Sequence, residues 1–240
     1  MRLYLILFTI MTQTIARPIF AQTGYGAEIG IGASQMHFAP SSLYTSASSS
    51  PMFSIKAAGV VDFSLNNHVY IQTGLGVSKK GDVRSFAYNT NDSFHESVAQ
   101  TLSLYYVDLP FNVVFKTGIQ GTGRFFFGIG AIPSYIIGGI NSIHASGTLS
   151  GVRYDTSTST AVRAGKPLGG FDMGLSLKAG YEFGTGMCLD IYYIAGVNDV
   201  GLGGEIDKNR MYGVSFSYFW GKGRNINKEA NELIDNSPIQ

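Results

Sequence analysis

Hydrophobic and polar residues alternate along much of the chain, and the stretch Phe171–Phe183 shows the pattern in its simplest form. Its odd positions are all apolar or aromatic, whereas its even positions are Asp, Gly, Ser, Lys, Gly and Glu. A period of two is typical of a β-strand, because successive side chains point to opposite faces of a sheet. The stretch therefore predicts a strand with one apolar face and one polar face.

The same alternation recurs and predicts eight strands of 10 to 16 residues. Strands of soluble proteins usually have about 5–6 residues, whereas a tilted strand needs about 9–11 residues to cross a bilayer. The strand lengths therefore favour a membrane barrel. The predicted strands are Gly26–Phe38, Met52–Leu65, His68–Lys79, Thr101–Lys116, Arg124–Gly138, Phe171–Phe183, Met187–Val197 and Met211–Trp220.

The connections between these strands alternate in length. Short turns lie at Asn66–Asn67, Thr117–Gly123 and Gly184–Gly186, and every other connection is longer. This arrangement is typical of bacterial outer-membrane barrels, which have tight periplasmic turns and long outer loops. We expect both termini in the periplasm and flexible, polar outer loops at Ser41–Ser50 and Ile140–Gly169, whose role the sequence leaves open between surface shielding and protein binding.

The two faces of the predicted strands differ in charge. On the apolar face the charged residues are His37 and Lys79, both near strand ends, and Gly59 is the one glycine there. Glycine suits the crowded interior of a narrow barrel. A continuous apolar face is solvated by lipid, whereas in water it would promote aggregation. The apolar face is therefore predicted to point outward. Ten charges are predicted to face the lumen: Glu28, Lys56, Asp62, Asp108, Lys116, Arg124, Asp172, Lys178, Glu182 and Asp190.

These inward charges predict a polar plug. An eight-stranded barrel has a lumen that side chains can fill, so solute flux is not expected. Each buried charge needs a partner, because an unpaired one costs several kcal/mol. Acids on the first two strands and bases on the fourth and fifth predict ion pairs that cross the lumen and hold the barrel rigid. A proton or ion path is the alternative.

Aromatic residues on the outward face gather near both ends of the strands, whereas the middle of each strand is mainly aliphatic. Two aromatic girdles around an aliphatic band mark the two water interfaces of a membrane barrel. The predicted interface aromatics are Phe53, Phe63, Tyr105, Phe115, Phe125, Phe127, Tyr135, Phe171, Tyr181, Phe183, Tyr212, Tyr218 and Trp220.

The beginning of the chain has the features of an export signal. Arg2 precedes an apolar run, and the segment ends near the small residue Ala21. We therefore expect a cleavable signal peptide at residues 1–22, a barrel at residues 23–220 and a polar periplasmic tail at residues 221–240. Cys188 is the only cysteine, so no intramolecular disulfide can form.

Composition narrows the function classes. The net charge is +1, which gives no reason to expect a nucleic-acid partner. No cofactor and no metal site is predicted. An enzyme site at the rim is an alternative, because His144 lies beside Ser142 and Ser146 with Asp155 nearby, but a Ser/Thr-rich loop contains such residues by composition. A non-enzymatic membrane barrel is favoured, and a soluble or periplasmic ligand-binding barrel is the other alternative.

Four stretches resemble a known family. They are "YYVDLPFNVVFK", "GFDMGLSLKAGYEF", "LDIYYIAGVNDV" and "KNRMYGVSFSYFWG", and the similarity covers residues Gly24 to Trp220. They are similar to strands of the PorT-like outer-membrane β-barrel family of Bacteroidota-type bacteria. The resemblance implies an eight-stranded antiparallel up-and-down transmembrane β-barrel, surrounded by outer-membrane lipid. It also implies that the barrel-insertion machinery reads the last strand, and it links the family to envelope protein partners or secretion machinery.

Overall fold

The computed structural model describes residues 23–37, 46–91, 94–118, 121–149, 151–163, 170–198 and 208–220. The predicted signal peptide, residues 1–22, and the predicted tail, residues 221–240, lie outside the described residues. Within the described part of the chain, no helix is long and apolar enough to span a membrane.

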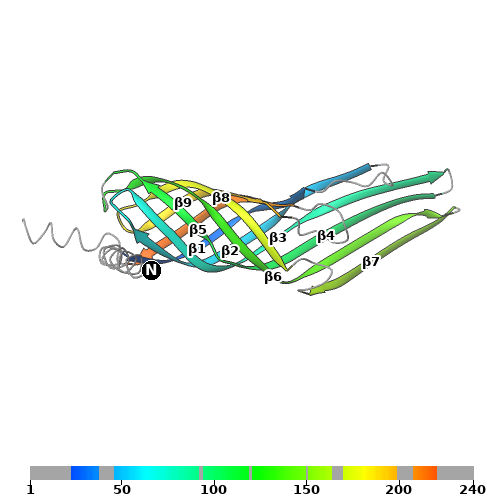
Figure 1. Cartoon of the computed structure of the whole chain (residues 1–240). Helices are drawn as coiled ribbons and strands as arrows, with labels where there is room; N and C mark the ends of the chain where they lie inside the picture. Colours follow the sequence, from blue (N-terminus) through cyan, green and yellow to red (C-terminus); the bar gives the residue numbers. More distant parts are fainter. Residues whose placement is uncertain are drawn as a thin grey trace, which may run out of the picture.

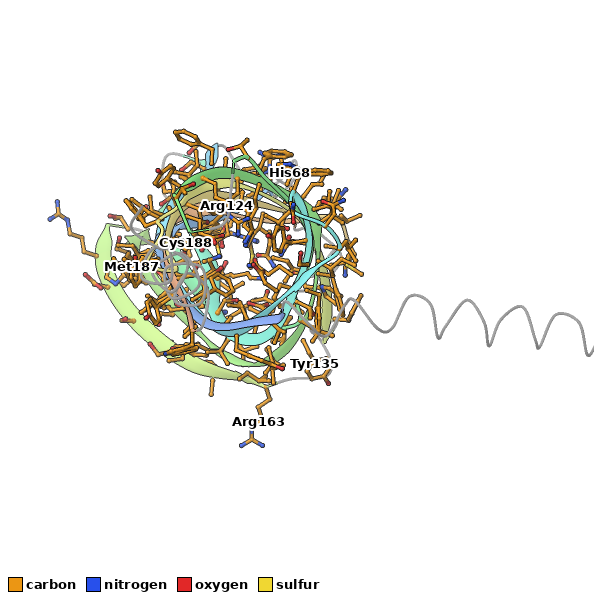
Figure 2. The ribbon with its side chains drawn as sticks, turned by 90° about the vertical axis from the view of Figure 1, so that its left-hand side faces the viewer. His68, Arg124, Tyr135, Arg163, Met187 and Cys188 are labelled. Carbon is orange, nitrogen blue, oxygen red and sulfur yellow. The ribbon has the colours of Figure 1, made fainter. Side chains whose placement is uncertain are left out.

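The described residues form one antiparallel sheet of ten strands that closes on itself (Figures 1 and 2). The sheet closes because β1 pairs with both β2 and β10, while β2 also pairs with β3. The strands are β1 (Thr23–His37), β2 (Ser46–Ser64), β3 (Val69–Asn91), β4 (Phe94–Asp108), β5 (Phe111–Lys116), β6 (Arg124–Leu149), β7 (Val152–Arg163), β8 (Phe171–Glu182), β9 (Met187–Gly196) and β10 (Lys208–Trp220).

The wall of the barrel has eight strands, although the sheet has ten. Strands β4 and β5 both pair with β3 and β6, so they are two parts of one wall strand. The break between them falls at Leu109 and Pro110, where proline has no N–H to donate to the sheet. Strand β7 pairs with β6 beyond the stretch that β8 occupies. The predicted eight-stranded antiparallel barrel is therefore confirmed.

The wall is apolar outside and polar inside, as the alternation predicts. Leu175 and Ile191 are 56% and 64% exposed, whereas Lys178 and Asp190 are 9% and 3% exposed. Small residues let the strands coil tightly: a Cβ added to Gly32 would lie 2.0 Å from the carbonyl oxygen of Tyr212 on β10. Charges and glycines consequently occupy the narrow interior.

Five strands continue well beyond one end of the barrel (Figure 1). We call this part the extension; it is a sheet in the order β2-β3-β4-β6-β7. It consists of Ser46–Pro51, Asp82–Asn91, Phe94–Gln100, Gly139–Leu149 and Val152–Arg163.

The extension corrects the prediction of flexible loops. The loop predicted at Ser41–Ser50 is β-strand from Ser46 onward, and the loop predicted at Ile140–Gly169 contains the end of β6 and all of β7. These segments were predicted as loops because both of their faces are polar, so the alternation that marks the wall strands is absent. Backbone pairing and the β-propensity of Thr and Val still favour strands there.

Candidate functional site

The first part of the site is an ion-pair network inside the barrel, near the end with short turns. Lys116 Nζ on β5 lies 2.7 Å from both Asp62 Oδ2 on β2 and Glu182 Oε2 on β8. Arg124 Nη2 lies 2.9 Å from Glu182 Oε1, and Arg124 also donates a 2.8 Å hydrogen bond to the Tyr70 hydroxyl. All five side chains are buried. The network therefore joins strands on opposite sides of the lumen.

A second group of ion pairs adjoins the first. Lys56 Nζ on β2 is 2.5 Å from Glu28 Oε1, and Lys178 Nζ on β8 is 3.8 Å from Glu28 Oε2. Lys178 also donates a hydrogen bond to Gln72, and Asp190 accepts a 2.6 Å hydrogen bond from Ser215.

The two groups together are electrically neutral. They contain the four acids Glu28, Asp62, Glu182 and Asp190 and the four bases Lys56, Lys116, Arg124 and Lys178. These eight residues are among the ten charges that were predicted to face the lumen, and they lie on the strands to which the alternation assigned them.

A third group lies toward the extension. Lys80 Nζ on β3 is 3.5 Å from Asp108 Oδ1 and 3.9 Å from Asp172 Oδ2. Asp108 accepts a 2.5 Å hydrogen bond from Ser134, and Asp172 accepts a 2.8 Å hydrogen bond from Asn209. Two of the ten predicted lumen charges thus meet around a lysine that was not predicted.

Sequence reasoning missed Lys80, Asp82 and Arg84. All three are buried, and Arg84 Nε lies 2.9 Å from Asp82 Oδ2. They were missed because the predicted third strand ends at Lys79, whereas β3 continues to Asn91. The even positions Lys80, Asp82 and Arg84 continue the inward parity of this strand, and that parity was the signal that could have found them.

A cavity of about 10 Å³ lies at the level of the network, lined by Gln72, Lys116, Lys178 and Ser217 among others, and this is enough for about one water molecule. Lysines also stack on lumen tyrosines: Lys116 Nζ lies 4.3 Å from the centre of the Tyr70 ring. The view along the barrel places Arg124 inside the ring and Arg163 outside it (Figure 2).

The predicted interface aromatics are on the outside of the wall. Phe63 and Tyr181 are half-buried, and the other eleven are exposed. Near the short turns they contact one another, as in the edge-to-face pair of Phe125 and Tyr181 at 4.9 Å. Tyr25 and Tyr193 were missed, and both are also exposed on the outside; Tyr25 lies just before the predicted start of the first strand.

The extension carries the residues that raised the enzyme alternative. His144 Nδ1 lies 3.6 Å from Asp155 Oδ1, and these side chains are 51% and 72% exposed. The Ser142 hydroxyl, however, is 2.9 Å from the Ser159 hydroxyl. A base and an orienting acid thus lie together, but the hydroxyl of Ser142 is engaged elsewhere.

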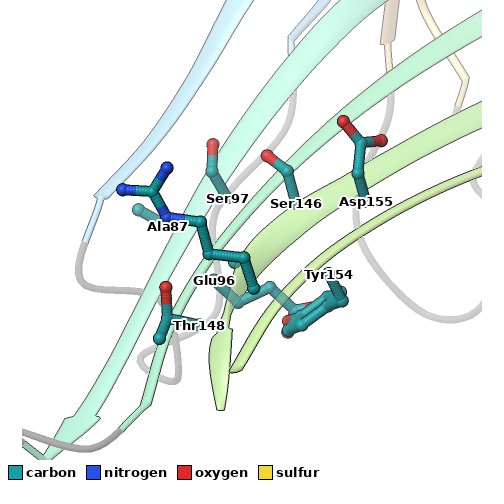
Figure 3. A pocket seen from close by; sticks show the side chains of 9 residues that line it. Ala87, Glu96, Ser97, Ser146, Thr148, Tyr154 and Asp155 are labelled. Atoms are coloured by element: carbon teal, nitrogen blue, oxygen red, sulfur yellow. The ribbon is translucent and has the colours of Figure 1, made fainter. Parts of the chain in front are cut away.

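An open pocket of about 600 Å³ lies beside these residues (Figure 3). Figure 3 shows hydroxyl and carboxylate groups of Ser97, Ser146 and Asp155 side by side along neighbouring strands. Within the ranges that the structure describes, no group of three or more His, Cys, Asp or Glu residues could hold a metal ion.

The family model described as "Outer membrane protein beta-barrel domain" matches residues 20–201 of the chain. The chain belongs to this family. It is therefore a bacterial outer-membrane β-barrel protein, and the apolar outer surface of its wall faces lipid. No curated protein matches this outer-membrane barrel.

Several solved structures are similar to this outer-membrane barrel. One is Ail, the attachment invasion locus protein of Yersinia pestis, in complex with the heparin analogue sucrose octasulfate, at 14% identity and a TM-score of 0.33. Another is Neisserial surface protein A, at 10% identity and a TM-score of 0.38. The alignments cover 82% of this chain and 99% and 98% of those chains, respectively.

Proposed function

We propose that this outer-membrane barrel is a non-enzymatic interaction module, in which the wall anchors and orients the extension for binding to another protein. The observation that carries the proposal is the extension itself. Strand β3 continues from Lys79, which pairs with the girdle residue Tyr105, to Asn91. At about 3.3 Å per residue, the twelve residues after Lys79 continue for about 40 Å along the strand.

The orientation of the barrel is part of the proposal. We place the extension outside the cell and both termini in the periplasm, because outer-membrane barrels have short turns on the periplasmic side. The turn between β8 and β9 is of this short kind and contains Gly186 with a φ of 89°. Residues 1–22 would then act as the export signal that brings the chain to this membrane.

The edge of the extension suits strand addition. Within the described ranges β7 pairs with β6 alone, so its other edge offers unpaired backbone groups. Natural edge strands are usually protected by lysine, proline or bulges, whereas the seven residues Thr156–Val162 are uncharged and contain no proline. An extended segment of a partner could add to this edge through main-chain hydrogen bonds.

The interior favours a supporting role over transport. The charges near the short turns balance one another, and a cavity among them has room for about one water molecule. We infer that the polar plug makes the barrel a rigid base. The resemblance to PorT-like barrels suggests an envelope or secretion partner of Bacteroidota-type bacteria, and this finer assignment stays a prediction.

Site-specific cross-linking on intact cells tests this function. A photo-cross-linking residue placed at Thr158 on the open edge of β7 should form one discrete adduct, whereas the same residue at Ser85 in the middle of the sheet should not. Thr158→Lys, which adds an edge charge, should abolish co-purification of the adducted protein. Unchanged co-purification of that protein after removal of residues 142–160 would refute the proposal.

A further inference from the structure

An apolar groove of about 310 Å³ indents the outer surface of the wall between β2, β3, β4 and β6. Its walls include the outward side chains of Ile55, Val77, Tyr105 and Ile137, which are 40%, 53%, 39% and 54% exposed, respectively. The floor includes Ala57, whose side chain is a single methyl group. The groove therefore opens toward the lipid and not toward the lumen.

Two local features of the sheet accompany the groove. The pairing of β2 with β3 shifts register between Pro51 and Ile55, and the pairing of β4 with β6 shifts between Tyr105 and Tyr106. Bulges of this kind bend a strand locally. The groove consequently lies between two bends of the wall, at the level of the girdle next to the extension.

The groove has an open path along β2 toward the middle of the membrane. The next outward position after Ala57 is Gly59, which pairs with Leu75. A Cβ added to Gly59 would meet only the carbonyl oxygen of Leu75, at 4.0 Å. Two successive outward positions without a large side chain leave a narrow trough, which suits a linear aliphatic chain.

The mouth of the groove is basic. Lys79 lines it and pairs across the sheet with Tyr105, and the described residues provide no ion-pair partner for its ammonium group. The same row of the sheet continues through Gly138 to Arg163. The outward carboxylate of Asp155 lies eight residues further along β7, so positive charge dominates near the girdle.

We propose that this groove binds one acyl chain of an anionic lipid in the leaflet next to the extension. The chain occupies the trough over Ala57 and Gly59, and the phosphate of the head group contacts Lys79 and the Tyr105 hydroxyl. A compact ammonium on a flexible stem is well suited to hold a phosphate as a point charge. The inference rests on the lipid-facing wall and does not require a protein partner at β7.

Native mass spectrometry of the full-length protein tests the proposal. The probes are phosphatidylglycerol and phosphatidylcholine with identical acyl chains, added to the purified barrel in detergent. We expect one tightly held phosphatidylglycerol, at least tenfold preferred over phosphatidylcholine. Lys79→Gln should reduce this preference to less than threefold, and Ala57→Leu, which fills the trough, should reduce retention of phosphatidylglycerol at least tenfold.

Ala179→Leu is the matched control. Ala179 also faces outward, on β8, four strands away from β2 around the ring of eight. This variant should retain lipid like the unmodified protein, which separates filling of the groove from a general change of the wall. Equal retention of phosphatidylglycerol by the unmodified protein, Ala57→Leu and Ala179→Leu would overturn the proposal. Equal retention of the two lipids by the unmodified protein would also overturn it. A polypeptide that co-purifies and is displaced by Ala57→Leu would also overturn it, because the groove would then hold protein.

Discussion

Lys116 and Glu182 form a 2.7 Å ion pair across the interior of the barrel, although they are 66 positions apart in the chain. The same ammonium group also contacts Asp62, so a single cation neutralises acids from two separate strands. Removal of this cation would leave two carboxylates close together in a buried site. The network therefore makes a specific contribution to stability that can be measured.

We predict that Lys116→Met strongly destabilises the folded barrel. Breaking a buried pair by removing one partner typically costs about 3–5 kcal/mol, because the remaining charge stays buried. The free energy of unfolding should be measured by urea titration in detergent micelles. Lys79→Met, which removes an outward lysine, is the control and should change it by less than about 1 kcal/mol. Equal effects of the two variants would argue against the plug.

Lys178→Met should lower the unfolding temperature in detergent for a related reason. Lys178 lies near Glu28 and donates a hydrogen bond to Gln72. The substitution would leave Glu28 with Lys56 as its ion partner among the described residues. We expect a smaller loss than for Lys116→Met, because Lys178 lies 3.8 Å from Glu28, whereas Lys116 lies only 2.7 Å from each of two acids. An unchanged melting curve would show that this part of the network does not hold the barrel together.

Glycine on the inward face should be far less replaceable than glycine on the outward face. A Cβ at Gly32 would lie 2.0 Å from a backbone oxygen of β10, whereas a Cβ at Gly59 would meet no atom closer than 4.0 Å. Gly32→Ala should therefore cost about 1–3 kcal/mol through overpacking. Gly59→Ala should be nearly neutral. Urea unfolding of the two variants side by side measures the difference, and similar losses would contradict the close packing of β1 against β10.

Most strands of the barrel wall could be predicted from the sequence, but the contacts between distant strands could not. The alternation in Phe171–Phe183 is enough to place Lys178 and Glu182 inside, because the period of a strand is fixed by geometry. It cannot show that Lys116 meets Asp62 and Glu182, since that depends on the register between strands distant in the chain. The extension was missed for a different reason: β7 is exposed on both faces over most of its length, so no apolar face marks it.

The extension should be dispensable for folding of the barrel. The buried cluster at its base consists of Met36, Leu102, Leu104, Tyr106 and Ile136, with Val162 packed against it. Replacing residues 142–160 by a short turn would keep all of these residues and the entire ion-pair network. We therefore expect the shortened protein to melt within a few degrees of the full-length protein.

The measurement for this deletion is circular dichroism during heating, combined with the heat-dependent migration of the folded barrel on gels. The reason for the expected result is that stability is not uniform across a structure, and exposed strands with few buried contacts contribute little to it. A large loss of melting temperature would mean that the extension and the wall fold as one unit. Retained stability together with loss of the cross-linked partner would instead separate the two roles, leaving anchoring to the wall and recognition to β7.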